Sequence, residues 1–170
     1  SGTDNLGTLK RNMAATLDEF LGAAEYLLGH SRYTPKVHLV ERGSSTHMNH
    51  VRWDLSFSTI AAIKKMTGLP VLVDASHGTG RADLVEPLTL AGIAAGADGF
   101  IVEVHPEPEK SLSDADQAFP LGDLPRLLRK ARRVKTAVEA DAGDDYWGKY
   151  ENASPEQQLG HIDAQTRAAL

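Results

Sequence analysis

The 170-residue sequence contains no cysteine. The chain therefore has no disulfide, no thiolate nucleophile and no thiolate metal ligand of its own, and a bound metal would have to use nitrogen and oxygen ligands. It also lacks an excess of basic residues, since 18 Lys and Arg stand against 23 Asp and Glu. A nucleic-acid-binding surface normally shows a basic patch, so we expect partners that are small molecules or proteins.

Long apolar runs are absent as well, because none approaches the roughly 20 residues that a membrane-spanning helix needs. No charged and then apolar leader opens the sequence. We therefore expect a cytoplasmic protein with no membrane partner. The length suffices for one domain with a core, although a complete eight-fold barrel typically needs about 250 residues.

What is present is an alternation of strand and helix patterns. Four short apolar runs are typical of parallel strands covered on both faces: Leu6 to Lys10, Lys36 to Val40, Pro70 to Val73 and Gly99 to Val104. Four segments have helical spacing: Thr16 to Leu28, Ser58 to Met66, Arg81 to Ala95 and Leu124 to Ala140. In the first helix, Thr16 and Glu19 form a possible capping box. The order predicts an α/β fold of four βα units, half of a TIM-type (β/α)8 barrel with outer helices.

Two regions are predicted from the change in composition at Asp141. Residues 1–140 form the half-barrel domain. Residues 141–170 form a tail rich in Asp, Gly, Glu and Gln that carries Tyr146, Trp147 and Tyr150. We expect these aromatic residues to dock the tail on a neighbouring subunit.

Polar residues follow each predicted strand, at the edge where the carboxyl ends of parallel strands converge. Among them, His77, Glu103 and Asp114 supply an imidazole and two carboxylates, a donor set suited to Mn, Fe, Co or Zn. Lys10 and Arg42 suit an anionic substrate beside it. Charged residues at strand ends are also common as solvated loop residues, and the spacing by itself leaves this alternative open.

Several motifs resemble the second half of the type I 3-deoxy-D-arabino-heptulosonate-7-phosphate (DAHP) synthases, in order from about Leu9 to Gln117. They are Leu9-Lys10-Arg11, Glu19-Phe20, Ala23-Ala24-Glu25-Tyr26, Glu41-Arg42-Gly43, Val73-Asp74-Ala75-Ser76-His77, and the run from Ile101 through His105-Pro106-Glu107-Pro108 to Asp114. The last run is the most specific of these motifs.

The resemblance implies a metal-dependent enzyme that condenses phosphoenolpyruvate with a phosphorylated aldose, erythrose 4-phosphate. It implies that His77, Glu103 and Asp114 bind the divalent metal ion. Lys10, Arg42, His77 and His105 are the implied substrate contacts, with Lys10 and His77 as the catalytic candidates. Such an enzyme belongs to the shikimate pathway of aromatic amino acid biosynthesis.

The chain also departs from that family. It lacks the family's fourth ligand, a cysteine, together with the neighbouring Lys-Pro-Arg-Thr-Ser type motif and a Gly-Ala-Arg segment. Within the matching half, Asn12 and Ala75 replace a glycine and a proline, and the loop from Arg42 to Ser56 differs at most positions. Because this loop differs, the resemblance does not establish the second substrate.

A four-strand half-barrel would expose two sheet edges and an inner face, so we expect it to pair with a second copy or with a partner chain, unless the chain is a fragment. Two other functions stay open at this point. One is a repurposed enzyme of specialised metabolism, with His47 and His50 as new site residues. The other is a non-catalytic partner or regulatory subunit.

Overall fold

A parallel four-stranded sheet forms the centre of the computed structural model, which describes residues 6–30 and 36–140. The strands are β1 (Leu6–Lys10), β2 (Lys36–Glu41), β3 (Val71–Asp74) and β4 (Gly99–Ile101). They pair in chain order, β1-β2-β3-β4, and every pair is parallel. The predicted strand positions and their parallel arrangement are confirmed.

Helices connect the strands. The four predicted helices correspond to α1 (Leu17–His30), α2 (Phe57–Thr67), α4 (Ala82–Ala94) and α5 (Leu124–Glu139). The capping box is also present, because Thr16 N donates to Glu19 Oε2 at 2.8 Å while Glu19 N donates to Thr16 Oγ1 at 3.3 Å. The backbone hydrogen bond from Thr16 holds the pKa of Glu19 below its usual value.

One local prediction is corrected by the structure. The expected strand Gly99 to Val104 is too long: β4 ends at Ile101, and β5 (Val104–His105) pairs instead with β6 (Phe119–Pro120) in a separate two-stranded sheet. The chain leaves the main sheet because Glu103 N donates to Ser76 Oγ and Glu103 O accepts from Phe119 N. After β3 the chain forms a short helix, α3 (Ala75–Thr79), capped by Asp74.

Three 3-10 turns lie in the connection after β5 and before α5. They are η1 (Pro108–Lys110), η2 (Ala115–Gln117) and η3 (Leu121–Asp123). Together with β6 they return the chain toward α5. The second of them, η2, brings a buried glutamine next to the end of β4.

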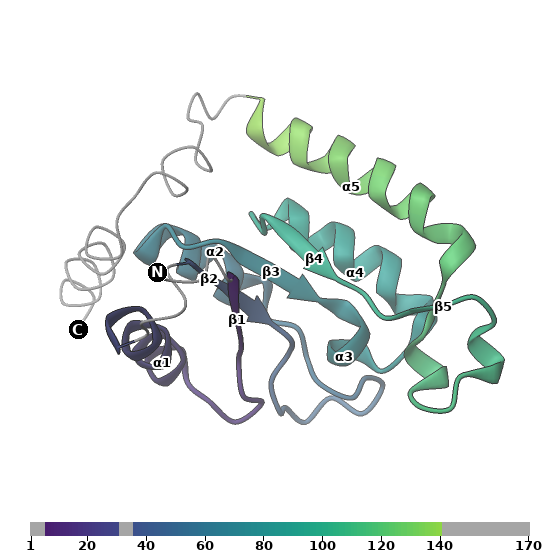
Figure 1. Ribbon diagram of the computed structural model, residues 1–170, viewed down its shortest axis with the longest axis horizontal. Helices are drawn as coiled ribbons and strands as arrows, with labels where there is room; N and C mark the ends of the chain where they lie inside the picture. The colour runs from purple at the N-terminus through teal and green to yellow at the C-terminus, as the bar shows by residue number, and fades with distance from the viewer. Residues whose placement is uncertain (1–5, 31–35, 141–170) are drawn as a thin grey trace, which may run out of the picture.

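One apolar core lies between the sheet and the helices. It joins Val37 and Leu39 of β2 and Val71 and Val73 of β3 to buried residues of α1, α2, α4 and α5. Figure 1 shows α1 near β1 at one end of the sheet, with α4 and α5 at the other end near β4. Because side chains alternate along a strand, the opposite face carries the row formed by Lys10, Val40, Leu72 and Gly99.

At the amino-terminal ends of the strands, Asp98 joins α2 to the start of β3. Its carboxylate accepts from Lys64 Nζ at 2.8 and 2.9 Å and from Val71 N at 2.8 Å. Burial lowers the pKa of Lys64, and the neighbouring Asp98 charge acts in the opposite direction. Burial also lowers the pKa of His38, and the nearby Asp98 charge again acts in the opposite direction.

The predicted tail, 141–170, lies outside the described residues, as do residues 1–5 and 31–35. Within the described ranges, no helix combines the length and the apolar character needed to cross a bilayer.

At Gly92, α4 lies very close to β3. A Cβ atom at this position would lie 2.6 Å from Val73 Cγ1 and 2.7 Å from Val73 Cβ, a separation that real Cβ atoms essentially never show. Gly92 therefore lets α4 pack directly on β3, as the absence of a side chain allows.

We predict that Gly92→Ala lowers the free energy of unfolding by about 1–3 kcal/mol, because the added methyl group overpacks the core. Chemical denaturation followed by circular dichroism measures this loss. Combining it with Val73→Ala should recover part of the stability, since space is returned at the same contact.

The matched control is Gly22→Ala in α1, where no atom lies within 4 Å of an added Cβ. There we expect a neutral or stabilising effect of up to about 1 kcal/mol, because alanine favours the helix over glycine. Equal losses at both glycines would contradict the packing explanation.

Candidate functional site

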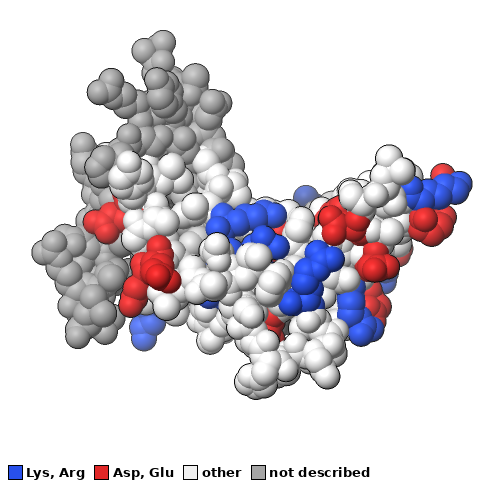
Figure 2. All heavy atoms as spheres, turned by 90° about the horizontal axis from the view of Figure 1, so that it is seen from below, with Lys and Arg blue, Asp and Glu red and all other residues white. Residues whose placement is uncertain are grey.

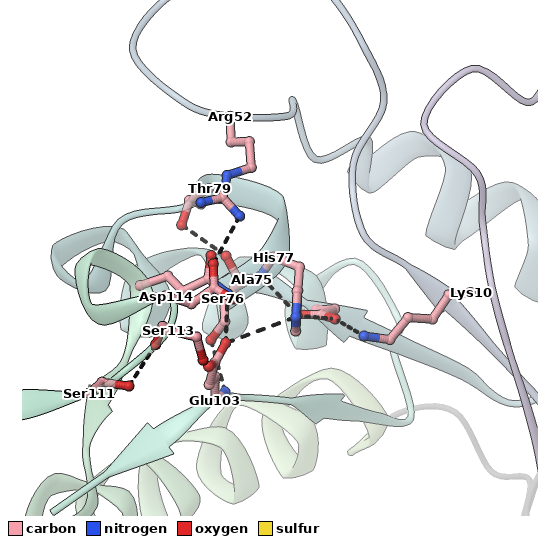
Figure 3. Close-up of polar contacts among 12 residues, drawn as sticks. Lys10, Arg52, Ala75, Ser76, His77, Thr79, Glu103, Ser111, Ser113 and Asp114 are labelled. Atoms are coloured by element: carbon pink, nitrogen blue, oxygen red, sulfur yellow. Dashed lines mark hydrogen bonds and ion pairs between the residues drawn. The ribbon is translucent and has the colours of Figure 1, made fainter. Parts of the chain in front are cut away.

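The fully buried carboxylate of Asp74 lies at the carboxyl end of β3 and accepts hydrogen bonds from three groups. Lys10 Nζ approaches it from the end of β1 at 2.8 Å. His77 N donates to Oδ1 at 3.0 Å, which caps α3. The ring Nδ1 of His77 lies 2.9 Å from Oδ2 and 3.0 Å from Oδ1. Asp74 thereby holds both Lys10 and His77 in place (Figure 3).

This contact decides the orientation of the imidazole. An ionised carboxylate can only accept, so the hydrogen is assigned to Nδ1 of His77, and in the neutral ring Nε2 carries a free lone pair. That nitrogen lies 3.9 Å from Glu103 Oε2. Figure 3 shows Lys10, His77 and Glu103 following one another across the site.

Glu103 is held from two sides in the segment between β4 and β5. Its backbone N donates to Oγ of the buried Ser76 at 3.0 Å. Its side-chain Oε2 accepts from Gln117 Nε2 at 2.6 Å. The Glu103 carboxylate is therefore fixed toward His77 although it lies beyond the last hydrogen bond of β4.

Asp114, the third predicted metal ligand, has a different partner. Its Oδ1 lies 3.4 Å from Nη1 of Arg52, and both side chains are exposed. Its backbone has φ 52°, a left-handed conformation that is uncommon outside glycine. The structure thus brings His77 and Glu103 together and leaves Asp114 on Arg52. The described ranges contain no group of three or more His, Asp or Glu arranged to hold an ion.

The two remaining predicted substrate contacts occupy different surroundings. Arg42 follows β2, and its Nε is buried with no hydrogen-bond partner among the residues that the structure describes. His105 belongs to β5, where Nδ1 accepts from Glu107 N at 3.0 Å. Seen from the side of the loops that follow β1 and β2, Lys and Arg side chains gather near the middle of the surface, with Asp and Glu to either side (Figure 2).

Arg11 and Glu41, which also follow strands, form a buried structural pair. Arg11 Nη2 donates to Glu41 Oε1 at 2.9 Å, and Nε lies 2.7 Å from Oε2. Gly43 N donates to the same carboxylate at 2.8 Å. Through these contacts Glu41, at the end of β2, is joined to the residue that follows β1, the neighbouring strand.

The donors at the His77 and Glu103 pair fit a divalent cation. Both Nε2 and Oε2 are lone-pair acceptors, so at 3.9 Å they have no hydrogen to share when the ring is neutral. Two ligands of a tetrahedral ion, each about 2.0–2.2 Å from it, are separated by about 3.4 Å, so Nε2 and Oε2 would move about 0.5 Å closer on binding one. The Asp74 contact on Nδ1 is also the carboxylate partner that metal-binding histidines commonly have.

Three contributors were missed by reasoning from the sequence. Asp74 was marked only as a polar residue at a strand end, although its place directly after an apolar run is the signal for a buried carboxylate. Arg52 and Gln117 carry no local signal. Their partners, Asp114 and Glu103, are 62 and 14 residues away in the chain.

Comparison with known proteins places this arrangement in a family. A profile of the DAHP synthetase I family matches residues 1–140. The chain belongs to this family. A relative, the phospho-2-dehydro-3-deoxyheptonate aldolase of Thermotoga maritima, is 44% identical over 130 residues, which cover 76% of this chain and 38% of the relative. The 2-dehydro-3-deoxyphosphooctonate aldolase of Desulfotalea psychrophila is 35% identical over 115 residues, covering 61% and 40%.

Solved structures of the family agree with the fold. A truncated 3-deoxy-D-arabino-heptulosonate 7-phosphate synthase from Thermotoga maritima superposes with a TM-score of 0.72 at 44% identity, over 77% of this chain and 49% of that one. A Thermotoga maritima DAHP synthase crystal structure gives a TM-score of 0.74, over 79% and 39%. The chain spans less than half the length of these relatives, so its four βα units correspond to half of a DAHP synthase barrel.

Proposed function

We propose that this chain contributes the metal-binding half of a DAHP synthase-type active site, which condenses phosphoenolpyruvate with a phosphorylated aldose. The observation that carries the proposal is the orientation of His77 by Asp74, which aims Nε2 at Glu103 at the carboxyl ends of the strands. In such a reaction the methylene carbon of phosphoenolpyruvate bonds to the aldehyde carbon, whose oxygen gains a proton. Water adds at the enol carbon, and phosphate leaves.

His77 and Glu103 would hold a divalent ion of Mn, Co, Fe or Zn, with Asp114 as a further ligand once it separates from Arg52. When bound, such an ion polarises the aldehyde carbonyl as a Lewis acid. The chain itself supplies the orientation. Asp74 fixes the imidazole, and Ser76 and Gln117 fix Glu103 before any ligand arrives.

Lys10 and Arg42 would hold the anionic groups of phosphoenolpyruvate. The buried, unpartnered Nε of Arg42 supports this role, because a buried donor without an acceptor is unfavourable unless a ligand supplies one. The Lys10 side chain is 36% exposed although it binds Asp74. It therefore reaches both the interior of the site and the surface. His105, in the separate sheet of β5 and β6, remains a predicted contact.

Erythrose 4-phosphate is the aldose we propose. Heptonate and octonate aldolases both match the chain, and identity is higher to the heptonate enzyme, at 44% against 35% for the Desulfotalea psychrophila octonate enzyme. The loop from Arg42 to Ser56 contributes Arg52, whose guanidinium reaches Asp114. This choice is tested by supplying aldose phosphates of four and of five carbons. Mass spectrometry then identifies which product forms.

The first prediction from this proposal concerns His77. The full chain should bind Mn²⁺ or Co²⁺. Loss of a residue that only hydrogen bonds to a metal ligand typically weakens metal binding about 10- to 100-fold. Because His77 is proposed as a ligand itself, His77→Ala should weaken binding by more than this. Isothermal titration measures the affinity, and phosphate release from phosphoenolpyruvate with erythrose 4-phosphate measures the reaction. Glu25→Ala, at an exposed carboxylate of α1 outside the proposed site, serves as the control for metal affinity.

The outcomes separate the alternatives. Metal binding without phosphate release from any aldose, measured on the chain together with the strands that complete its sheet, would contradict the proposed reaction and favour a repurposed enzyme. Absence of metal binding, with His77→Ala indistinguishable from the unmodified chain, would contradict the metal site and favour a non-catalytic partner subunit.

The second prediction concerns Arg42. Arg42→Ala should weaken phosphoenolpyruvate binding by about 10- to 100-fold, because hydrogen bonds to charged groups contribute about 1.5–3 kcal/mol. Titration calorimetry in the presence of Mn²⁺ measures this change. Arg81→Ala is the matched control, since that exposed guanidinium already binds Asp83 at 2.7 and 3.0 Å. Unchanged affinity in Arg42→Ala would rule out the assigned role.

We further infer that other strands complete the sheet, supplied by a second copy of this chain or by a partner chain. In the described part of the chain, β1 pairs with β2 alone and β4 with β3 alone, which leaves one edge of each strand open. The inner face also presents partly exposed apolar side chains, including Leu72 and Ile101.

For the self-paired assembly, native mass spectrometry at micromolar concentration should show twice the mass of one chain. Leu72→Lys should shift the population to single chains, because it places a charge on the inner face. Ala61→Lys, at an exposed position of α2, should leave the assembly unchanged. A single chain in the unmodified protein would exclude self-pairing.

A further inference from the structure

Gln117 is a fully buried polar side chain whose two polar atoms are in unequal positions. Nε2 donates to Glu103 Oε2 at 2.6 Å. Oε1 is buried and, within the described residues, has no hydrogen-bond partner. An apolar side chain of the same volume would avoid the free-energy cost of that oxygen. Stability alone therefore does not account for glutamine at this position.

The backbone around Gln117 keeps the amide in place. Gln117 N donates to Asp114 O at 3.1 Å at the end of η2, and Ala118 N donates to the same oxygen at 3.2 Å. Two residues later, Phe119 N donates to Glu103 O at 2.8 Å. The segment that carries Gln117 is thus attached to Glu103 by backbone and side chain, and to Asp114 by backbone.

The chemistry of the amide suits a carboxylate that must bind a cation. A carboxylate oxygen has two lone pairs, so Oε2 of Glu103 can accept from Gln117 and still use its other lone pair on the side of His77. The amide is a neutral donor, and it orients the carboxylate without cancelling its charge. A lysine or arginine in the same place would compete with the ion for that charge.

We propose that Gln117 is a positioning residue that holds Glu103 in its ion-binding orientation and couples it to Asp114. This role rests on the proposed metal site and names a residue outside its ligands. It makes η2 part of the site although no atom of Gln117 touches the ion.

The experiment compares Co²⁺ binding by the full unmodified chain, Gln117→Met and Gln117→Asn. Met removes the donor and the unpartnered oxygen at similar length, whereas Asn keeps an amide but withdraws it by one bond, about 1.5 Å. Both variants should bind Co²⁺ about 10- to 100-fold more weakly and show an altered visible absorption spectrum of the bound ion. The thermal midpoint of Gln117→Met should equal or exceed that of the unmodified chain.

Asp116→Asn is the matched control, an exposed residue of the same turn, and it should leave both affinity and spectrum unchanged. Should Gln117→Met not fold, Gln117→Asn decides the question alone. Unmodified Co²⁺ affinity and spectrum in the folded Gln117 variants would overturn the role of Gln117 and leave the metal site standing. Failure of the unmodified chain to bind Co²⁺ would overturn the metal site and this role together.

Discussion

The carboxylate of Asp74 is the group on which the rest of the site depends. A fully buried charge is tolerated only when it is paired and hydrogen bonded, and Asp74 meets this condition through Lys10, the first turn of α3 and the ring of His77. The partners come from two elements, β1 and α3, so the charge that must be satisfied also sets their relative positions. The requirement for stability and the requirement for an oriented imidazole are met by the same contacts.

A comparison of the amino-terminal and carboxyl-terminal ends of the strands shows that acceptors without a shared hydrogen face each other only at the carboxyl-terminal ends, in the part of the chain that the structure describes. At the amino-terminal edge, Asp98 is satisfied by Lys64 and by Val71 N, and the contact is complete within the protein. At the carboxyl-terminal edge, one partner of Asp74 is an imidazole, which has a second nitrogen on its far side. That nitrogen faces Glu103, another acceptor, at 3.9 Å. A buried carboxylate is therefore fully paired at the amino-terminal ends of the strands, whereas at the carboxyl-terminal ends its imidazole partner faces a second acceptor.

The sequence predicted the features that depend on local order. The apolar runs predicted four strands, the Thr16 and Glu19 spacing predicted the capping box, and strand ends predicted that His77 and Glu103 would meet. It could not predict where β4 ends, because that is decided by contacts of Glu103 with Ser76 and Phe119 from other segments. The sequence likewise could not predict the contact of Arg52 with Asp114 or that of Gln117 with Glu103. Both pairs are brought together only by the folded chain.

The pairing of Lys10 with Asp74 leaves this lysine able to bind an anion, the role proposed for it. An ammonium group has three hydrogens, and the contact at 2.8 Å engages one of them. Because the Lys10 side chain is partly exposed, the other two can reach an anion at the surface of the site. Asp74 also limits the motion of the side chain, so an anion would meet a cation that is already in position. Arg42 provides the complementary case, because its buried Nε has no hydrogen-bond partner within the described residues.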